Sequence, residues 1–358
     1  MSALKVIVLY GGISTEHEVS VHSAQTVCRI LAEQPEKYTV YPVFISKQGY
    51  WFLQTSCQLQ TPQDIPVTPV LCNGETIRAL DGSFSVKADE IFPVLHGTNC
   101  EDGTMQGFLE TLRVAYVGCS VLTSAIGMDK ELTKQLAQKV GVPVVDYQKI
   151  SVCKPYDKEQ LEAWALEQGL PLFVKPVRLG SSVGVRKITD LSQLHEAIAY
   201  ALTFDTDVLV EKGIDHAREI FCAVYGSADR LSVSACGELS QNSGEFFDYN
   251  AKYVVAGGCN MYIPAHIPVS MAENMQRDTA KIFNVLQGCG LARVDFLLDE
   301  KGSYYFSEIN TLPGMSETSL FPQLFEASGK NYTQILDELI LLAQKVDERK
   351  KSLSVSCQ

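Results

Sequence analysis

The sequence predicts an α/β protein in which an open parallel sheet is followed by two α+β units. First, 358 residues with 46% hydrophobic and 20% charged side chains suffice for two or three domains with cores. Second, the apolar run Lys5–Leu9 leads into Gly11-Gly12 and then into apolar residues at helical spacing, the pattern of a buried strand, a turn and a helix. Third, strand-like segments flank Asp299–Ser303, whose turn formers predict an antiparallel hairpin.

The first unit, residues 1–118, is expected to be the open α/β domain. Further strands are predicted at Tyr38–Ile45 and Glu90–Leu95, and the second of these leads into His96-Gly97. Open parallel sheets bind ligands at the carboxyl ends of their strands. Gly11-Gly12 and His96-Gly97 therefore mark the expected ligand-binding edge of this sheet.

Two helix starts in the first unit carry acidic residues. Thr15 and Glu18 have the spacing of a capping box, which leaves Glu16 without a structural task. A carboxylate at such a strand-to-helix turn can bind a substrate ammonium, although the helix dipole alone also favours an acid there. Glu101 and Asp102 are interpreted as the capped start of the next helix, with Asp102 near the N-cap.

The second unit, residues 119–211, alternates helices and strands. Its predicted helices cover Lys130–Val140 and Ser192–Leu202, and its predicted strands cover Pro171–Lys175, Val185–Ile188 and Val208–Glu211. Lys175 closes a strand, and the small residues of Gly180–Gly184 follow. Backbone N–H groups of such a loop can bind polyphosphate oxygens while the lysine adds charge. The lysine precedes the glycines, so this is not a P-loop, and an ordinary hairpin turn is the alternative.

The third unit, residues 212–348, contains the hairpin around Asp299–Ser303 and a final amphipathic helix, and residues 349–358 form a polar tail. The helix has an apolar stripe that we interpret as core packing, formed by Ile335, Leu336, Leu339, Ile340, Ala343 and Val346.

The hairpin carries the polar residues that are most informative about chemistry. Side chains two apart on a strand share a face, so pairing Asp295 with Glu308 places Arg293 opposite Asn310. One face then holds two carboxylates, an amide oxygen and a guanidinium. Such oxygens, together with substrate phosphates, suit Mg²⁺. The guanidinium beside them can stabilise charge that develops in group transfer. A solvated acidic sheet face is the alternative.

Composition excludes several classes of function. The net charge is −12 and no basic run is long enough to follow a phosphate backbone, which argues against nucleic-acid binding. No apolar stretch is long enough for a membrane span, and the N-terminal apolar run is too short for a signal peptide. Eleven cysteines without framework spacing indicate reduced thiols in a cytosolic protein, and the six histidines lack zinc-ligand spacing.

The motifs, taken in order, resemble the D-alanine–D-alanine ligases of the ATP-grasp superfamily. The resemblance runs from residue 10 to residue 320 through Tyr10–Ser20, His96–Gly107, Met128–Lys130, Lys175–Gly184, Asp248–Tyr253, Arg293–Phe296 and Glu308–Leu320. It implies the ATP-grasp fold, in which the second and third units clasp ATP.

The resemblance also implies an activity. The carboxylate of one D-alanine attacks the γ-phosphate of ATP, and the amine of a second D-alanine displaces phosphate from the acyl phosphate. The dipeptide serves peptidoglycan precursor synthesis for the cell wall. The family implies ATP as co-substrate, two Mg²⁺ ions with Mn²⁺ as an alternative, a cytoplasmic location and a homodimer, without a nucleic-acid or membrane partner.

The resemblance also implies a role for each site residue. ATP would contact Lys130, Lys175, Ser182, Glu211, Lys212, Ile214, Glu219 and Lys252. The metal ligands would be Asp295, Glu308 and Asn310. Arg293 and the N–H of Gly314 would stabilise the oxyanion. Glu16 would bind the first ammonium and would join Ser181 and Tyr253 in a hydrogen-bonded set that closes a loop over the site. D-Alanine would also contact His96, Ser319 and Leu320.

Three segments depart from the family pattern: Thr98–Cys100, Leu179 and Asp215–Arg218. The last makes Ile214 and Glu219 weaker assignments than Glu211. The alternatives are a relative that uses D-lactate or D-serine, another ATP-grasp carboxylate–amine ligase, and a nucleotide-binding regulatory module with a dead site. The complete set of proposed metal ligands and lysines argues against the last alternative.

Overall fold

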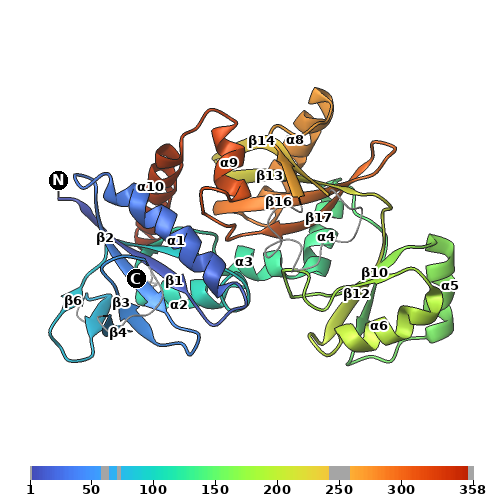
Figure 1. Cartoon of the computed structure of the whole chain (residues 1–358), viewed down its shortest axis with the longest axis horizontal. Helices are drawn as coiled ribbons and strands as arrows, with labels where there is room; N and C mark the ends of the chain where they lie inside the picture. The colour runs from blue at the N-terminus through green and yellow to red at the C-terminus, as the bar shows by residue number, and fades with distance from the viewer. Residues whose placement is uncertain (1, 58–63, 71–73, 242–258, 354–358) are drawn as a thin grey trace.

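The computed structural model of the chain describes residues 2–57, 64–70, 74–241 and 259–353. Within these residues three β-sheets follow one another along the sequence, with eight, four and five strands. Figure 1 shows the first sheet on the left, the second on the right, and the third between and above them. The predicted α/β class is confirmed, and the structure has a sheet with parallel strands followed by two antiparallel sheets.

The first sheet has a parallel centre, as predicted. β1 (Leu4–Gly11) lies between β2 (Tyr38–Ile45) and β7 (Glu90–Leu95) and runs parallel to both. All six residues of β7 are buried, as expected for a strand covered on both faces. The sheet continues through β3 (Trp51–Leu53), β4 (Ile65–Pro69), β5 (Ile77–Ala79) and β6 (Ser85–Val86) beyond β2, and through β8 (Ala115–Tyr116) beyond β7.

Helix α1 (His17–Ala32) follows β1, but the capping box predicted for Thr15 and Glu18 is wrong. Glu16 is the N-cap residue, without a capping hydrogen bond from its side chain. The helix therefore starts later than the sequence pattern implies. Glu18 points outward, where one of its oxygens lies 2.6 Å from Lys47 Nζ. The N–H of Glu16 donates to Ser14 Oγ at 3.0 Å, and this turn replaces the expected box.

The second sheet is antiparallel throughout, in the order β11-β10-β12-β9. Its strands are β9 (Tyr147–Ser151), β10 (Leu172–Pro176), β11 (Arg186–Ile188) and β12 (Asp207–Lys212). Of the helices in this part of the chain, α6 (Leu194–Ala201) packs on this sheet, and α5 (Lys158–Gln168) and the short 3₁₀ helix η1 (Leu191–Gln193) lie beside each other. Helices α3 (Val121–Met128) and α4 (Lys130–Lys139) contact each other and β17 (Tyr304–Asn310) of the third sheet. The helix expected at Ser192–Leu202 is thus divided between η1 and α6.

The third sheet has the order β15-β14-β13-β16-β17 and contains the predicted hairpin. Its strands are β13 (Arg218–Ser227), β14 (Arg230–Gln241), β15 (Cys259–Tyr262), β16 (Gly290–Leu298) and β17 (Tyr304–Asn310). Helices α8 (Val269–Val285) and α9 (Leu320–Glu326) pack on this sheet. The remaining helix, α2 (Thr104–Leu112), follows β7 in the first unit.

The last helix, α10 (Tyr332–Lys351), returns to the first unit. Five residues of its predicted apolar stripe are buried, from Ile335 to Ala343, in a core cluster shared with β1, α1 and β13, and Val346 at the end of the stripe is only partly buried. In Figure 1 the red helix lies beside the blue N-terminal sheet. The helix continues to Lys351, past the residue 349 at which we expected a polar tail. Because the end of the chain packs on its beginning, the division at residues 118 and 211 stays a prediction.

In the part of the chain that the structure describes, no helix combines the length and the apolar character that a membrane span requires.

Candidate active site

The first part of the site lies where β1 and β7 end side by side. Gly97 follows β7 with φ +81°, and a Cβ added there would lie 2.9 Å from Glu16 Oε2 and 2.5 Å from Ser14 Oγ. The Glu16 carboxylate therefore packs directly on the Gly97 backbone, and only glycine leaves room for it. The two strand ends selected from the sequence do meet.

His96 ties this edge to the loop after β17. It is 3% exposed, with Nδ1 2.9 Å from the Leu312 carbonyl and Nε2 3.3 Å from Ser23 Oγ. Ser23 Oγ also accepts the N–H of Met315 at 3.1 Å. Burial lowers the pKa of His96, against the opposing charge of Glu16, so the imidazole is neutral near pH 7.

Glu101 belongs to the site, and the interpretation of this residue as part of a helix start is wrong. Asp102 suffices for that task, since it accepts the N–H groups of Asn99 at 2.8 Å and Thr104 at 3.0 Å. Glu101 points inward, with Oε1 3.9 Å from His96 Nδ1. Burial, followed by the charge of Glu16, raises the pKa of Glu101 to about 8. No signal in the local sequence separates Glu101 from Asp102, because both are acids at the same helix start.

The hairpin forms the second part of the site with the predicted register. Asp295 pairs with Glu308 and Arg293 with Asn310. Arg293 donates to both oxygens of Asp295, each at 2.7 Å, and its guanidinium lies 5.4 Å from the centre of the Phe221 ring. The other face of the hairpin is buried, as expected from Val294, Phe296, Phe306 and Ile309.

These residues have the donor chemistry that Mg²⁺ requires. Two carboxylates and an amide oxygen lie on one face of two paired strands, and Glu308 Oε2 is 3.3 Å from Lys130 Nζ. Among the residues that the structure describes, no three His, Cys, Asp or Glu side chains cluster to hold a metal ion. A site of this kind fits an ion that takes a few protein oxygens and completes its shell with phosphates and water.

A buried charge cluster surrounds Lys175, one of the lysines predicted to contact phosphates. Glu211, 3% exposed, lies 2.6 Å from Lys175 Nζ and 3.3 Å from Lys134 Nζ. Burial alone would raise the pKa of Glu211, but the two lysines hold it below its ordinary value. Glu211 thus neutralises and positions Lys175. Sequence reasoning did not select Lys134, because it lies among other polar residues of α4. Burial lowers the pKa of Lys134.

The loop Gly180–Gly184 extends from the end of β10. Ser181 and Ser182 have φ of +53° and +57°, and a Cβ on Gly184 would lie 2.8 Å from Pro176 Cγ. Lys130 Nζ donates to the Leu179 carbonyl at 2.6 Å, which joins α4 to this loop. A contact between Ser181 and Glu16 stays a prediction.

The other predicted residues are distributed around this framework. Gly314 lies against Ser319, since a Cβ there would be 2.8 Å from Ser319 Oγ, and Leu320 begins α9. Lys212 ends β12, Glu219 lies on β13, and Ile214 lies in the connection between them. Lys252 and Tyr253 lie outside the described residues.

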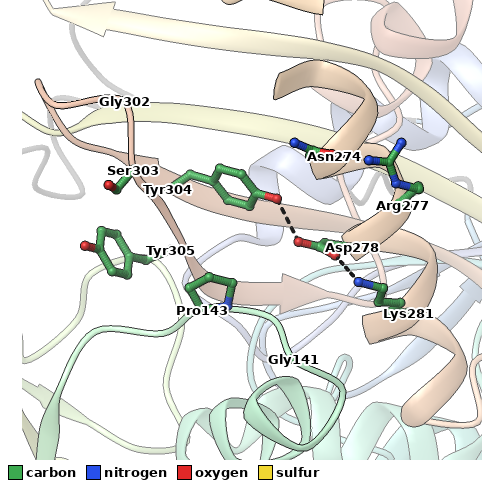
Figure 2. Close-up of a pocket in the computed structure, with 10 residues that line it drawn as sticks. All are labelled: Gly141, Pro143, Asn274, Arg277, Asp278, Lys281, Gly302, Ser303, Tyr304 and Tyr305. Atoms are coloured by element: carbon green, nitrogen blue, oxygen red, sulfur yellow. Dashed lines mark hydrogen bonds and ion pairs between the residues drawn. The ribbon is translucent and has the colours of Figure 1, made fainter. Parts of the chain in front are cut away.

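A cavity of about 550 Å³ lies elsewhere, between α8 and the turn of the hairpin. Figure 2 shows Asp278 at its wall, bonded to Tyr304 Oη at 2.8 Å and Lys281 Nζ at 2.7 Å. None of the site residues predicted from the sequence lines it.

Comparisons with known proteins agree with this geometry. Residues 5–119 match the family model described as D-ala D-ala ligase N-terminus, and residues 136–341 match the one described as D-ala D-ala ligase C-terminus. A D-alanine–D-alanine ligase of Caldicellulosiruptor bescii is 41% identical and covers 99% of both chains. One from Streptococcus thermophilus is 40% identical over 98% of this chain and 99% of its own.

The chain belongs to the D-alanine–D-alanine ligase family. As a member it is an ATP-dependent enzyme that ligates two D-alanines. The D-alanine–D-alanine ligase of Coxiella burnetii has the same fold, with a TM-score of 0.85, 30% identity and coverage of 98% of this chain and 97% of its own. The VanG D-Ala:D-Ser ligase of Enterococcus faecalis has a TM-score of 0.83, 34% identity and coverage of 96% and 100%.

Proposed function

We propose that this family member performs its ligation at the junction of the β1 and β7 ends with the β16–β17 hairpin. The observation that carries the proposal is the register of the hairpin, which puts Arg293, Asp295, Glu308 and Asn310 on one face. On this assignment Glu16 binds the ammonium of the first D-alanine. Its carboxylate lies at the strand ends, on the Gly97 backbone.

The phosphates are assigned to the lysine side of the site. Lys130 lies on α4 and donates to the Leu179 carbonyl beside the loop, and Lys175 lies on β10, which precedes the loop, and is paired with Glu211. The loop offers backbone N–H groups around Ser181 and Ser182. The assignment of Ser182, Glu211, Lys212, Ile214, Glu219 and Lys252 to ATP remains part of the proposal. Glu211 acts through Lys175, because it is buried against that lysine.

Charge that develops during transfer is assigned to Arg293 and the N–H of Gly314. Arg293 is held in one orientation by both oxygens of Asp295, so it needs no rearrangement when an oxyanion forms. Two Mg²⁺ ions, with Mn²⁺ as an alternative, would be held by Asp295, Glu308 and Asn310 and would supply positive charge against the phosphates. His96 is neutral and supports the wall of the substrate pocket beside Leu312.

The second D-alanine is assigned to Ser319 and Leu320, and we propose that the enzyme strongly prefers it over D-lactate or D-serine at neutral pH. The solved neighbour from Enterococcus faecalis is a D-Ala:D-Ser ligase, so fold similarity alone does not select the acceptor. On the family pattern, Tyr253 joins Ser181 and Glu16 and favours dipeptide formation. Tyr253→Phe should raise the share of depsipeptide formed from D-lactate at low pH. An unchanged product ratio from about pH 6 to about pH 9 would leave Tyr253 as a packing residue.

The experiment that tests the assignment is ADP release with D-alanine, D-serine, D-lactate and L-alanine as separate acceptors. We expect rapid ADP release and dipeptide formation with D-alanine, and neither with the other three acceptors. Release with L-amino acids would favour another carboxylate–amine ligase, and nucleotide binding without release would favour a regulatory module. Sedimentation tests the proposed homodimer, limited proteolysis tests the proposed domain boundaries, and cell fractionation tests the proposed cytoplasmic location.

A further inference from the structure

Arg178, at the base of the loop Gly180–Gly184, has a set of partners that no role assigned so far explains. Its Nη2 lies 2.6 Å from Asp205 Oδ1, 2.8 Å from Asp207 Oδ2 and 2.9 Å from Thr206 Oγ1. Its Nη1 lies 3.4 Å from Asp129 Oδ2. One guanidinium therefore contacts carboxylates from two separate segments, the start of α4 and the start of β12.

Asp129 connects this contact to a phosphate-side lysine. Its Oδ1 caps α4 by accepting the N–H groups of Glu131 at 3.1 Å and Leu132 at 3.0 Å, while its Oδ2 faces Arg178. The next residue is Lys130, the first of the helix. Asp129 therefore fixes the start of α4 with one oxygen and contacts Arg178 with the other, and both contacts restrict where Lys130 lies.

The backbone of the loop base is held by the same two segments. The N–H of Lys130 donates to the Val177 carbonyl at 3.1 Å, and its Nζ donates to the Leu179 carbonyl at 2.6 Å. The N–H of Arg178 donates to Asp205 Oδ2 at 2.7 Å. The backbone before the tip is therefore fixed, whereas a Cβ at Gly180 would meet no atom within 4 Å.

We propose that Arg178 is a positioning residue for ATP, which clamps the base of the Gly180–Gly184 loop to the N-terminus of α4 and so sets the spacing between Lys130 and the loop N–H groups. This rests on the proposed phosphate roles of Lys130 and the loop. The guanidinium suits the task because its planar, forked donors can serve several carboxylates in fixed directions, which a lysine ammonium cannot reproduce. Without it, the ion pair that Asp207 retains among the described residues is with Lys149, at 3.9 Å.

The test compares Arg178→Ala and Arg178→Lys with Arg78→Lys. Arg78 is a matched control, because its side chain is 41% exposed against 39% for Arg178 and it bonds one carboxylate, Glu75, far from the site. For Arg178→Ala we expect KM for ATP to rise by about 10- to 100-fold, the scale of a lost charge-assisted hydrogen-bond set. The KM for D-alanine and the melting temperature should stay near those of the Arg78→Lys control.

Two readouts separate positioning from general stabilisation. Added guanidine should restore part of the ATP affinity of Arg178→Ala and none of it in Arg178→Lys, since only the first variant leaves a vacant guanidinium site. A KM for ATP within about twofold of wild type would overturn the proposal. So would an equal rise in both KM values together with a lower melting temperature. If Arg178→Ala does not fold, an unchanged KM for ATP in Arg178→Lys overturns it.

Binding of a non-hydrolysable ATP analogue, followed by calorimetry, separates this inference from the proposed function. A wild-type protein that binds the analogue but releases no ADP with D-alanine would defeat the proposed function. The loss of analogue affinity in Arg178→Ala would still support the clamp, and retained affinity would still overturn it.

Discussion

Replacement of Glu90 by glutamine should remove a large part of the pH dependence of stability. Glu90 begins β7 and has an exposed fraction of 0%. Among the described residues, neither of its carboxylate oxygens has a hydrogen-bond partner. Burial raises the pKa of Glu90 to about 9, and the charges of Asp347 on α10 and of Asp89 add to the effect.

The magnitude follows from linkage. A carboxyl with a raised pKa in the folded state is protonated there while the unfolded chain is already ionised. Stability is therefore fullest below pH 4.5, the ordinary value, and is lost as the pH rises toward 9. Each pH unit within this window costs about 1.4 kcal/mol, so the cost is about 3 kcal/mol at neutral pH.

The assay is urea unfolding of the wild type and Glu90→Gln at several pH values, with the exposed Glu36→Gln as control. The difference between wild type and Glu90→Gln should change by about 4 kcal/mol between about pH 5.5 and about pH 8.5. The amide adds a roughly constant penalty, because it too lacks partners. A difference that stays flat across this range would show that Glu90 ionises as it does in water, which would refute the reasoning.

Three further predictions concern the site. Glu308→Gln should retain the fold by circular dichroism but lose about 100-fold or more in kcat at saturating ATP and Mg²⁺, since one metal-facing charge disappears; near wild-type turnover would contradict the metal assignment. Arg293→Ala should lower kcat by about 10²- to 10³-fold with little change in nucleotide affinity, and weaker ATP binding at normal kcat would make it a nucleotide clamp instead. Lys134→Met should lower the free energy of unfolding by about 3 kcal/mol, because it leaves Glu211 buried with one partner fewer. The double change with Glu211→Leu should recover part of that loss in thermal unfolding, and no recovery would mean that the two side chains do not act as a pair.

Much of the hairpin chemistry could be read from the sequence, because strand periodicity and turn formers are local signals. The pairings of Asp295 with Glu308 and of Arg293 with Asn310 were predicted correctly. The β-bulge was not predicted. The register shifts directly after Asp295, so that Phe296 faces Phe306 and both rings enter the core. The apolar packing that favours the bulge involves other elements, which local sequence does not contain.

Other parts depend on contacts between distant segments. Lys134 and Glu211 come from α4 and β12, and only the packing of these elements brings their charges together. Glu101 is acidic in a loop rich in turn formers, and its burial beside His96 is a property of the folded site. The apolar stripe on α10 was predicted to pack in a core, but the sequence did not predict that it would pack against the first sheet.

The packing of α10 on the first sheet has a consequence for synthesis on the ribosome. The strands of that sheet end at Tyr116, whereas the helix that shares its core begins at Tyr332. At common elongation rates the intervening chain takes roughly ten to forty seconds to appear. During this interval the apolar surface that later receives Ile335 and Leu339 is open to other proteins. We therefore expect nascent chains that stop before α10 to bind chaperones, and release of the helix to be the step that frees them.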